Sequence, residues 1–193
     1  MDSPRNPDFS GLIARLAVAL DGHAIPFMLI GGQAVLVHGE PRLTQDIDVT
    51  LGVDPSRLDD VTAVCDELEL EVLPNDVEEF VRSTFVLPAR HTRSGVRFDL
   101  IFSTTPYETQ AIARAVMVKV QDAQVPFASA EDLVVHKLFA GRPRDIEDAV
   151  GVLRRKGADL DWDYLEFWVL QFAEIPGREE LPQRLAALRS EIR

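Results

Sequence analysis

The sequence predicts an α+β fold, with helices and short strands interleaved over the first two thirds of its 193 residues and helices alone over the last third. The run Asp46-Ile47-Asp48-Val49-Thr50-Leu51 alternates polar with apolar residues, which is strand periodicity. Two pairs of β-forming runs, each joined by a short turn sequence, indicate hairpins. From Ser129-Ala130-Glu131-Asp132, which resembles a capping box, the pattern stays helical to the end of the chain.

The length and composition favour one continuous fold. Hydrophobic residues make up 46% of the chain, which is enough to bury a core without disulfide support. We find no internal repeat, no low-complexity tract and no long Pro/Gly/Ser linker. The change of pattern after Phe127 predicts a core over residues 1–127 and a small helical subdomain over residues 128–193, packed on that core.

The individual elements follow from periodicity and from start and stop signals. Apolar residues at helical spacing predict a first helix from Phe9 to Leu20, which Gly22 ends. Residues 27–30 predict a short strand, Gly31-Gly32 a turn, and residues 34–38 a short helix. The later predictions are a helix over about 56–68, hairpin strands at 85–90 and 96–102, a second hairpin at 115–120 and 124–127, a helix that begins near Pro143 and ends before Gly157, and closing helices at 161–173 and 179–192.

The charge balance restricts the class of partner. The chain has 32 Asp+Glu against 20 Lys+Arg, a net charge of −12, which opposes broad and sequence-blind DNA binding but leaves room for a local basic patch that receives one RNA end. Its one cysteine, Cys65, cannot form an internal disulfide, and no apolar run approaches the ~20 residues that span a bilayer. We therefore expect a soluble cytoplasmic protein with no membrane partner.

Two carboxylates and a glycine turn form the first candidate site. Residues two apart in a strand face the same way, so Asp46 and Asp48 present their carboxylates side by side, where a divalent cation would bind. The alternative is that both acids simply lie on the wet face of an edge strand. The Gly31-Gly32 turn precedes a helix, and its backbone N–H groups could meet phosphate oxygens, although most Gly-Gly pairs are only tight turns.

A third acid lies in an apolar run. Arg97-Phe98-Asp99-Leu100-Ile101-Phe102 places the carboxylate of Asp99 in a β-forming segment, where a charge without a counter-ion would be costly. The counter-ion is either a metal or Arg97, which lies on the same face of the strand. With three carboxylates the chain has the minimum set for two-metal phosphoryl chemistry, in which Asp46 and Asp48 bridge the ions and Asp99 holds the ion nearest the nucleophile and accepts its proton.

These motifs together resemble a known family. Gly31-Gly32-Gln33-Ala34 followed by Arg42-Leu43-Thr44-Gln45-Asp46-Ile47-Asp48 resembles the signature of minimal nucleotidyltransferases of the DNA-polymerase-β-like superfamily, closest to the AbiEii-type toxins of toxin–antitoxin systems. The later parts of that pattern resemble Phe98-Asp99-Leu100, Lys137, Arg142 and the run Arg144-Asp145-Ile146-Glu147-Asp148. The similarity spans about residues 27–150.

The resemblance implies a nucleotidyltransferase fold, with a mixed β-sheet flanked by helices and then a small C-terminal helical segment. It implies two Mg²⁺ ions, with Mn²⁺ as the alternative, held by Asp46, Asp48 and Asp99. The residues implied to bind the nucleoside triphosphate are Gly31, Gly32, Gln33, Thr44, Lys137 and Arg144. Asp145 and Asp148 lie three apart on one helix face, so we expect them to pair with Lys137 or Arg144 rather than to bind metal.

The function implied is transfer of a nucleoside monophosphate from an NTP to an acceptor, by a toxin-like enzyme acting on tRNA or other RNA and opposed by a cognate antitoxin protein. The candidate RNA-binding patch is Arg142, Arg144, Arg154, Arg155 and Lys156. Two alternatives stay open. One is an antibiotic nucleotidyltransferase for an aminoglycoside or lincosamide, which the acidic surface favours, and the other is a nucleotide-binding or partner-binding module without turnover.

Overall fold

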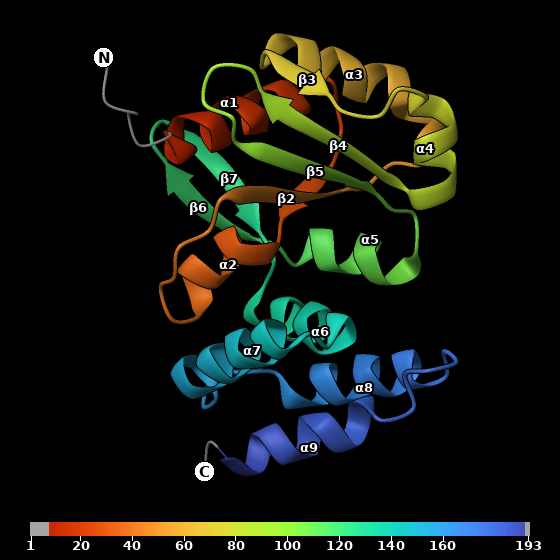
Figure 1. The fold of residues 1–193 in the computed structure, drawn as a ribbon. Coiled ribbons are helices and arrows are strands. Elements are labelled where there is room, and N and C mark those ends of the chain that lie inside the picture. The colour runs from red at the N-terminus through yellow and green to blue at the C-terminus, as the bar shows by residue number, and fades with distance from the viewer. Residues whose placement is uncertain (1–7, 192–193) are drawn as a thin grey trace. The chain divides into compact units, whose positions relative to one another are not determined.

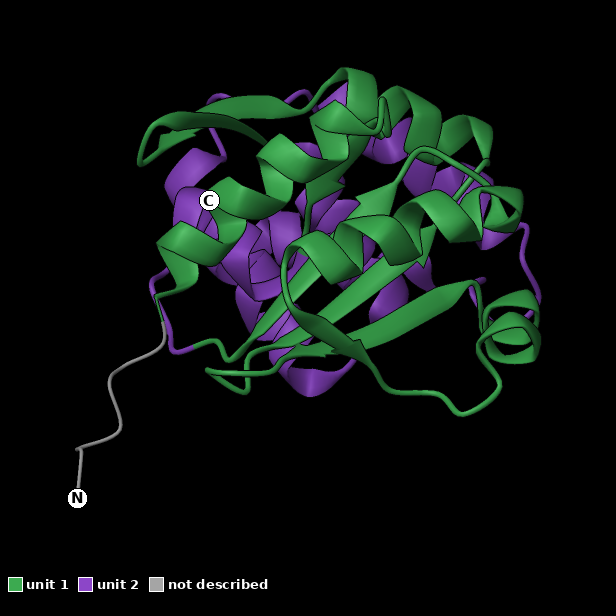
Figure 2. Cartoon of the chain, turned by 90° about the horizontal axis from the view of Figure 1, so that it is seen from above, with its two compact units in different colours: residues 1–30, 44–127 green, residues 31–43, 128–193 purple. Residues whose placement is uncertain are grey.

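The computed structural model describes residues 8–191, and the chain separates into two compact units (Figure 2). The sheet unit comprises residues 1–30 and 44–127, and the helical unit comprises residues 31–43 and 128–193. The helical unit therefore takes in a short early segment of the chain as well as the last third. The division into a core over 1–127 and a subdomain over 128–193 stays a prediction.

The sheet unit is built on a mixed sheet, and the described residues contribute seven strands in the order β3-β4-β5-β2-β1-β7-β6 (Figure 1). Neighbouring strands are antiparallel except in the pairs β2/β5 and β1/β7, which are parallel. The strands are β1 Phe27–Leu29, β2 Asp46–Leu51, β3 Leu70–Val72, β4 Val86–His91, β5 Arg97–Phe102, β6 Val116–Val120 and β7 Ala123–Phe127. The expected α+β class with a mixed sheet is confirmed.

Helices of the sheet unit pack against its strands. Helix α1 packs on β6 and β7, and it also contacts α3, which in turn packs on β3. The helices are α1 Phe9–Gly22, α3 Leu58–Glu67, α4 Val77–Thr84 and α5 Pro106–Ala113, with one 3-10 turn, Pro55–Arg57, before α3. The apolar positions of β2 and β5, such as Ile47, Val49, Phe98 and Leu100, are fully buried, so alternation along both strands separates a core face from a polar face.

Two helices of the helical unit begin at the start signals that the sequence indicates. Ser129 accepts a hydrogen bond from the Asp132 amide at the start of α6, and Pro143 occupies the first turn of α7. The helices are α2 Gly31–His38, α6 Ala130–Ala140, α7 Pro143–Lys156, α8 Trp162–Ala173 and α9 Leu181–Glu191. The end predicted for the last helix, residue 192, lies outside the described residues. Within residues 8–191, no helix has both the length and the apolar character to cross a membrane.

Sequence periodicity does not predict three elements of the sheet unit, which are β3, α4 and α5. Strand β3 is only three residues long, and α4 and α5 have eight residues each, too few for a repeating apolar stripe. Both helices nevertheless carry N-terminal caps, because the side chains of Asp76 and Thr105 accept hydrogen bonds from the amides three residues later. Pro106 after Thr105 is a second start signal.

Candidate active site

The strand register places the three predicted acids in one row. Strands β2 and β5 are parallel and pair residue for residue, so Asp48 lies opposite Asp99 and Asp46 lies opposite Arg97. Directly paired residues of adjacent strands project from the same side of a sheet, and so do residues two apart in one strand. Asp46, Asp48 and Asp99 therefore share one face, and we call them the acid row.

The acid row lies on the more open face of the strands. Asp46 is exposed, while Asp48 and Asp99 are half-buried. Farther along β2 the same face closes, because Thr50 is buried. The carboxylates thus occupy the beginnings of two neighbouring strands, where an ion or a substrate can reach them.

Asp99 has a protein partner in this structure. The Arg97 guanidinium donates from Nε to Asp99 Oδ1 at 3.1 Å, and its Nη2 lies 3.1 Å from the same oxygen. Half of the Arg97 side chain is exposed, against 26% of the Asp99 side chain. The ion pair that the sequence offers as the alternative to a metal is therefore formed, on a surface where such pairs contribute little to stability.

The donor chemistry of the acid row suits a hard divalent cation, because Mg²⁺ and Mn²⁺ take carboxylate oxygens. The row offers three carboxylates from two adjacent strands. Over residues 8–191, however, no group of three or more His, Cys, Asp or Glu side chains is arranged so that it could hold a metal ion together. The strand register thus brings the three acids to one face, but the Asp99 carboxylate points to Arg97 and not to the other two acids.

The predicted glycine turn is the first turn of α2 in the helical unit. Gly31 has a φ of +60°, in the left-handed region that side chains with a Cβ disfavour, so glycine is required there to turn the chain out of β1 into the helix. Gly32 and Gln33 follow within the helix and are buried. Backbone N–H groups of the first turn of a helix lack partners within the helix, which is the property that phosphate binding uses.

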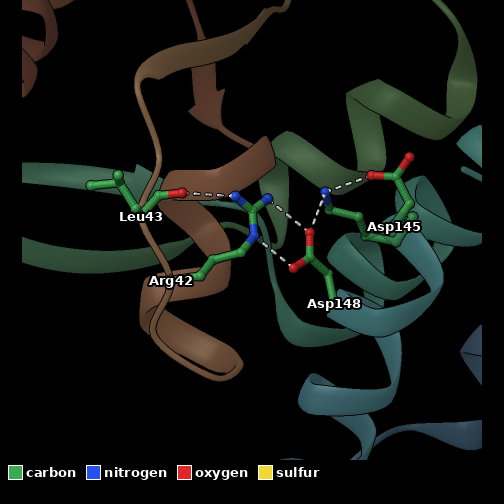
Figure 3. Close-up of polar contacts among 5 residues, drawn as sticks. Arg42, Leu43, Asp145 and Asp148 are labelled. Carbon is green, nitrogen blue, oxygen red and sulfur yellow. Dashed lines mark hydrogen bonds and ion pairs between the residues drawn. The ribbon is translucent and has the colours of Figure 1, made fainter. Parts of the chain in front are cut away.

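Four charged side chains of the helical unit form a cluster (Figure 3). Lys137, Asp145 and Asp148 are buried, and Arg42 is half-buried. Arg42 donates to both oxygens of Asp148, from Nε to Oδ1 at 2.7 Å and from Nη2 to Oδ2 at 2.9 Å. Lys137 Nζ lies 2.9 Å from Asp148 Oδ2 and 2.8 Å from Asp145 Oδ1. We call these four residues the ion-pair cluster. Its two positive and two negative charges balance, which is what burial requires.

The cluster confirms that Asp145 and Asp148 pair with Lys137. The second cation is Arg42, 106 residues away in sequence, and not Arg144, which is exposed. Burial favours the neutral form of Asp148, but hydrogen bonds from Arg42 and Lys137, and their charges, outweigh it and hold the pKa of this carboxyl below its ordinary value. Asp148 is thus a charged group at neutral pH that belongs to two partners at once.

The remaining predicted residues lie as follows. Thr44 is half-buried in the irregular segment before β2, and Arg144 lines a groove in the helical unit. That groove has a volume of about 440 Å³ and is lined by Glu40, Pro41, Arg42, Pro143, Arg144, Glu147, Asp148 and Gly151.

Two histidines lie near these motifs, His38 in α2 and His136 in α6. His38 is buried and its Nε2 lies 2.8 Å from the Ala128 carbonyl oxygen. Desolvation by burial lowers the pKa of His38, and it lowers the pKa of His136, beside Lys137, to about 4. Both imidazoles are therefore neutral at physiological pH.

The family model described as "Nucleotidyl transferase AbiEii toxin, Type IV TA system" matches residues 14–191. The chain belongs to the AbiEii nucleotidyltransferase family. No curated protein matches it. The predicted family is thereby confirmed, and with it the nucleotidyltransferase fold.

Solved structures with the same fold are distant in sequence from this AbiEii family member. An antigenic nucleotidyltransferase-like protein from Paracoccidioides brasiliensis has 16% identity and a TM-score of 0.53, with 91% of this chain and 92% of that one covered. ANT(2")-Ia in complex with adenylyl-2"-tobramycin has 19% identity and a TM-score of 0.51, covering 95% and 98%. The lincomycin-bound lincosamide antibiotic adenylyltransferase LnuA has 14% identity and a TM-score of 0.51, covering 76% and 98%.

Proposed function

We propose that this chain is a metal-dependent nucleotidyltransferase that transfers a nucleoside monophosphate from an NTP to the end of a tRNA or another RNA. The observation that carries the proposal is the acid row, in which the register of β2 and β5 puts Asp48 beside Asp99 with Asp46 two residues along. Membership of the AbiEii family supports nucleotidyl transfer as the reaction.

Asp46, Asp48 and Asp99 would hold the divalent ions, Mg²⁺ or alternatively Mn²⁺. When bound, such ions supply positive charge that neutralises the triphosphate and the departing pyrophosphate. To bind an ion, Asp99 would break its ion pair with Arg97. Breaking a partly exposed pair of this kind costs little free energy. Asp99 would also accept the proton of the attacking hydroxyl, since it lies on the same face as the other two acids.

Residues of the helical unit would bind the triphosphate. Lys137 has three N–H donors and uses two of them on Asp145 and Asp148, which leaves one donor for a phosphate oxygen. The backbone amides of Gly31 and Gly32 at the start of α2 would contact phosphate where a side chain would obstruct it. Gln33, Thr44 and Arg144 complete the proposed nucleotide contacts.

The net charge restricts where an RNA acceptor could bind. With a net charge of −12 the chain repels a polyanion over most of its surface, so RNA would bind only at a local patch. The basic residues Arg142, Arg144, Arg154 and Arg155 of α7 and its N-cap are exposed and provide such a patch. The family description, a Type IV toxin–antitoxin system, adds a cognate antitoxin as the proposed protein partner.

A second candidate acceptor is a cationic antibiotic. The same negative charge would attract an aminoglycoside. Resistance profiles of cells that express the chain test this candidate, which is abandoned if no aminoglycoside or lincosamide loses potency.

The decisive experiment supplies each radiolabelled NTP in turn, with Mg²⁺ and total RNA, to the wild-type chain, to Asp48→Asn and to Asp122→Asn. Asp122 is exposed in the β6–β7 turn and serves as the matched control for loss of one carboxylate. We expect label on RNA with the wild type and with the control, and about 1000-fold less with Asp48→Asn. Equal labelling by Asp48→Asn would refute the proposed role of the acid row.

A further inference from the structure

The sheet ends in two edge strands that differ in length and in charge. Strand β3, at one end, has three residues, and its central residue Glu71 is exposed. Strand β6, at the other end, has the five residues Val116-Met117-Val118-Lys119-Val120 and no acid (Figure 1). Among residues 8–191, β6 pairs with β7 alone. The outer backbone groups of an edge strand are a template on which another strand can pair.

The hairpin of β6 and β7 determines which backbone groups of β6 face outward. A two-residue turn joins the strands, and such a turn closes on a hydrogen-bonded pair, here Val120 and Ala123. Bonded and non-bonded pairs alternate along an antiparallel ladder, so the N–H and C=O groups of Met117 and Lys119 point away from β7. Pro126, which has no N–H, lies opposite Met117, as a pair without hydrogen bonds allows.

The side chains of this edge are largely apolar. The three valines of β6 project from the same side of the hairpin as the buried Val125 and Phe127, because directly paired residues share a face. Val116 on that side is nevertheless 41% exposed, and Met117 on the other side is 57% exposed. A partner strand on β6 would cover apolar side chains as well as bond to the outward backbone groups.

The charges around this edge balance, although the whole chain carries a net charge of −12. Helix α1, which packs on the hairpin, carries one basic and one acidic residue, Arg15 and Asp21. The hairpin itself carries Lys119 and Asp122. A second copy of this acidic chain is repelled by most of the surface and least by this edge, where no surplus acid attracts a basic partner instead.

One antiparallel register of two β6 strands satisfies both the backbone and the charges. Centred on Val118, it pairs Met117 of each copy with Lys119 of the other, so all the outward N–H and C=O groups bond across the interface. The valines of β6 then meet one another, and β-branched pairs stabilise a sheet. A register centred on Lys119 would oppose two ammonium groups. The strand is therefore complementary to itself, as a two-fold interface requires.

We propose that β6 is the interface of a homodimer, in which the β6 strands of two copies of this chain pair antiparallel about Val118 and join the two sheets into one. The inference does not depend on the proposed function, because β6 carries none of the residues proposed for catalysis or nucleotide binding. The other edge is unsuited to this role, since pairing of two β3 strands about Glu71 would oppose two carboxylates.

Sedimentation equilibrium of the full chain over a rising concentration series tests the dimer. The wild type should reach twice the mass of one chain. Met117→Lys would set two lysines against each other at two places in the interface, which should weaken the dimer about tenfold. Leu170→Lys is the matched control, because Leu170 is 54% exposed in α8 of the helical unit, and it should dimerise as the wild type does.

Two more variants test the register and the backbone bonds. Met117→Lys combined with Lys119→Glu would place opposite charges in each pair and should restore the wild-type affinity. Lys119→Pro removes an outward N–H but no bond to β7, so it should abolish the dimer and leave the chain folded. It also replaces Met117→Lys if that variant does not fold. In the wild type, hydrogen exchange of the Met117 and Lys119 amides should slow as the concentration rises.

Two results would overturn the inference. One is a wild type that stays monomeric up to about millimolar concentration. The other is a dimer that Met117→Lys and Lys119→Pro both leave unchanged, with no slowing of exchange at the Met117 and Lys119 amides, because another surface would then hold the copies together. Nucleotidyl transfer enters neither result, so a failure of the proposed function is distinguishable from a failure of the dimer.

Discussion

The two groups of acids in this protein contrast in burial and in charge balance. The ion-pair cluster is buried except for the half-buried Arg42. It holds two carboxylates and two cations, and it gives Asp148 two hydrogen-bonded partners within 2.9 Å. The acid row lies on a half-open strand face, where Asp99 shares a single oxygen with the exposed Arg97. Desolvation forces charge balance on the first group, whereas water screens the charges of the second. Capture of a metal by the row stays a proposal, whereas fixed geometry in the cluster follows from its hydrogen bonds.

The largest expected effect tests the acid row. Asp48→Asn should lower nucleotidyl transfer about 1000-fold, the value of several kcal/mol of charge stabilisation by a metal ion. The free energy of unfolding should stay unchanged or rise, since one of three neighbouring like charges is removed. Transfer assays and urea denaturation measure both quantities. A variant that loses stability and activity together would mean that the row is structural, and the contrast would fail.

The ion-pair cluster should show the opposite pattern at Asp148. Asp148→Ala leaves Arg42 and Lys137 with one carboxylate between them, and breaking a buried ion pair costs about 3 kcal/mol. Urea denaturation measures the loss. Glu79→Gln, which removes the acid of the exposed pair with Arg82, is the control and should change stability by less than about 1 kcal/mol. Equal effects of the two variants would contradict the assignment of the cluster.

Local signals predict much of the fold. The alternation of residues 46–51 gives β2, and the hairpins, the Ser129 cap and Pro143 give β4 to β7, α6 and α7. The order of strands is not local. Nothing in β2 or β5 alone tells that they are parallel neighbours, because that pairing joins segments about 50 residues apart through buried side chains such as Val49 and Leu100.

The sequence predicts which residues make up the candidate site better than it predicts which side chains pair with them. The motifs name Asp46, Asp48, Asp99 and Lys137, and the i, i+3 spacing on a helix predicts that Asp145 and Asp148 pair with a nearby cation. The second cation is not predictable from spacing, since Arg42 reaches Asp148 across 106 residues of sequence. Sequence also leaves two counter-ions open for Asp99, and the structure shows the ion pair with Arg97 formed.

A smaller effect, dependent on pH, should separate His136 from the charged cluster beside it. Its pKa in the folded chain is lowered to about 4 from an ordinary value of 6.5, mainly by burial. Between these values the unfolded chain binds a proton that the folded chain does not, so stability is complete above pH 6.5 and falls as the pH falls toward 4. From pH 7 to 5 the loss should reach at most about 2 kcal/mol, at 1.36 kcal/mol per unit.

Urea denaturation of His136→Gln at both pH values checks this, because the variant should lose that part of the pH dependence. His23→Gln is the matched control, since His23 lies partly in solvent beside Glu67. If His136→Gln keeps the full wild-type pH dependence, another group is responsible for it.

The smallest expected effect concerns Arg97. Its pair with Asp99 is the one feature of the acid row that resembles the ion-pair cluster. If the pair of Arg97 with Asp99 were structural, as the cluster is, its loss would destabilise the fold. Because half of the Arg97 side chain is exposed, we expect Arg97→Ala to change the free energy of unfolding by less than about 1 kcal/mol. Mn²⁺ should bind the variant at least as tightly as the wild type, because in the variant no guanidinium competes with the ion for Asp99 Oδ1. Weaker Mn²⁺ binding in a fully folded Arg97→Ala would show that Asp99 needs its arginine, and Asp99 would then belong with the ion-paired acids instead of the acid row.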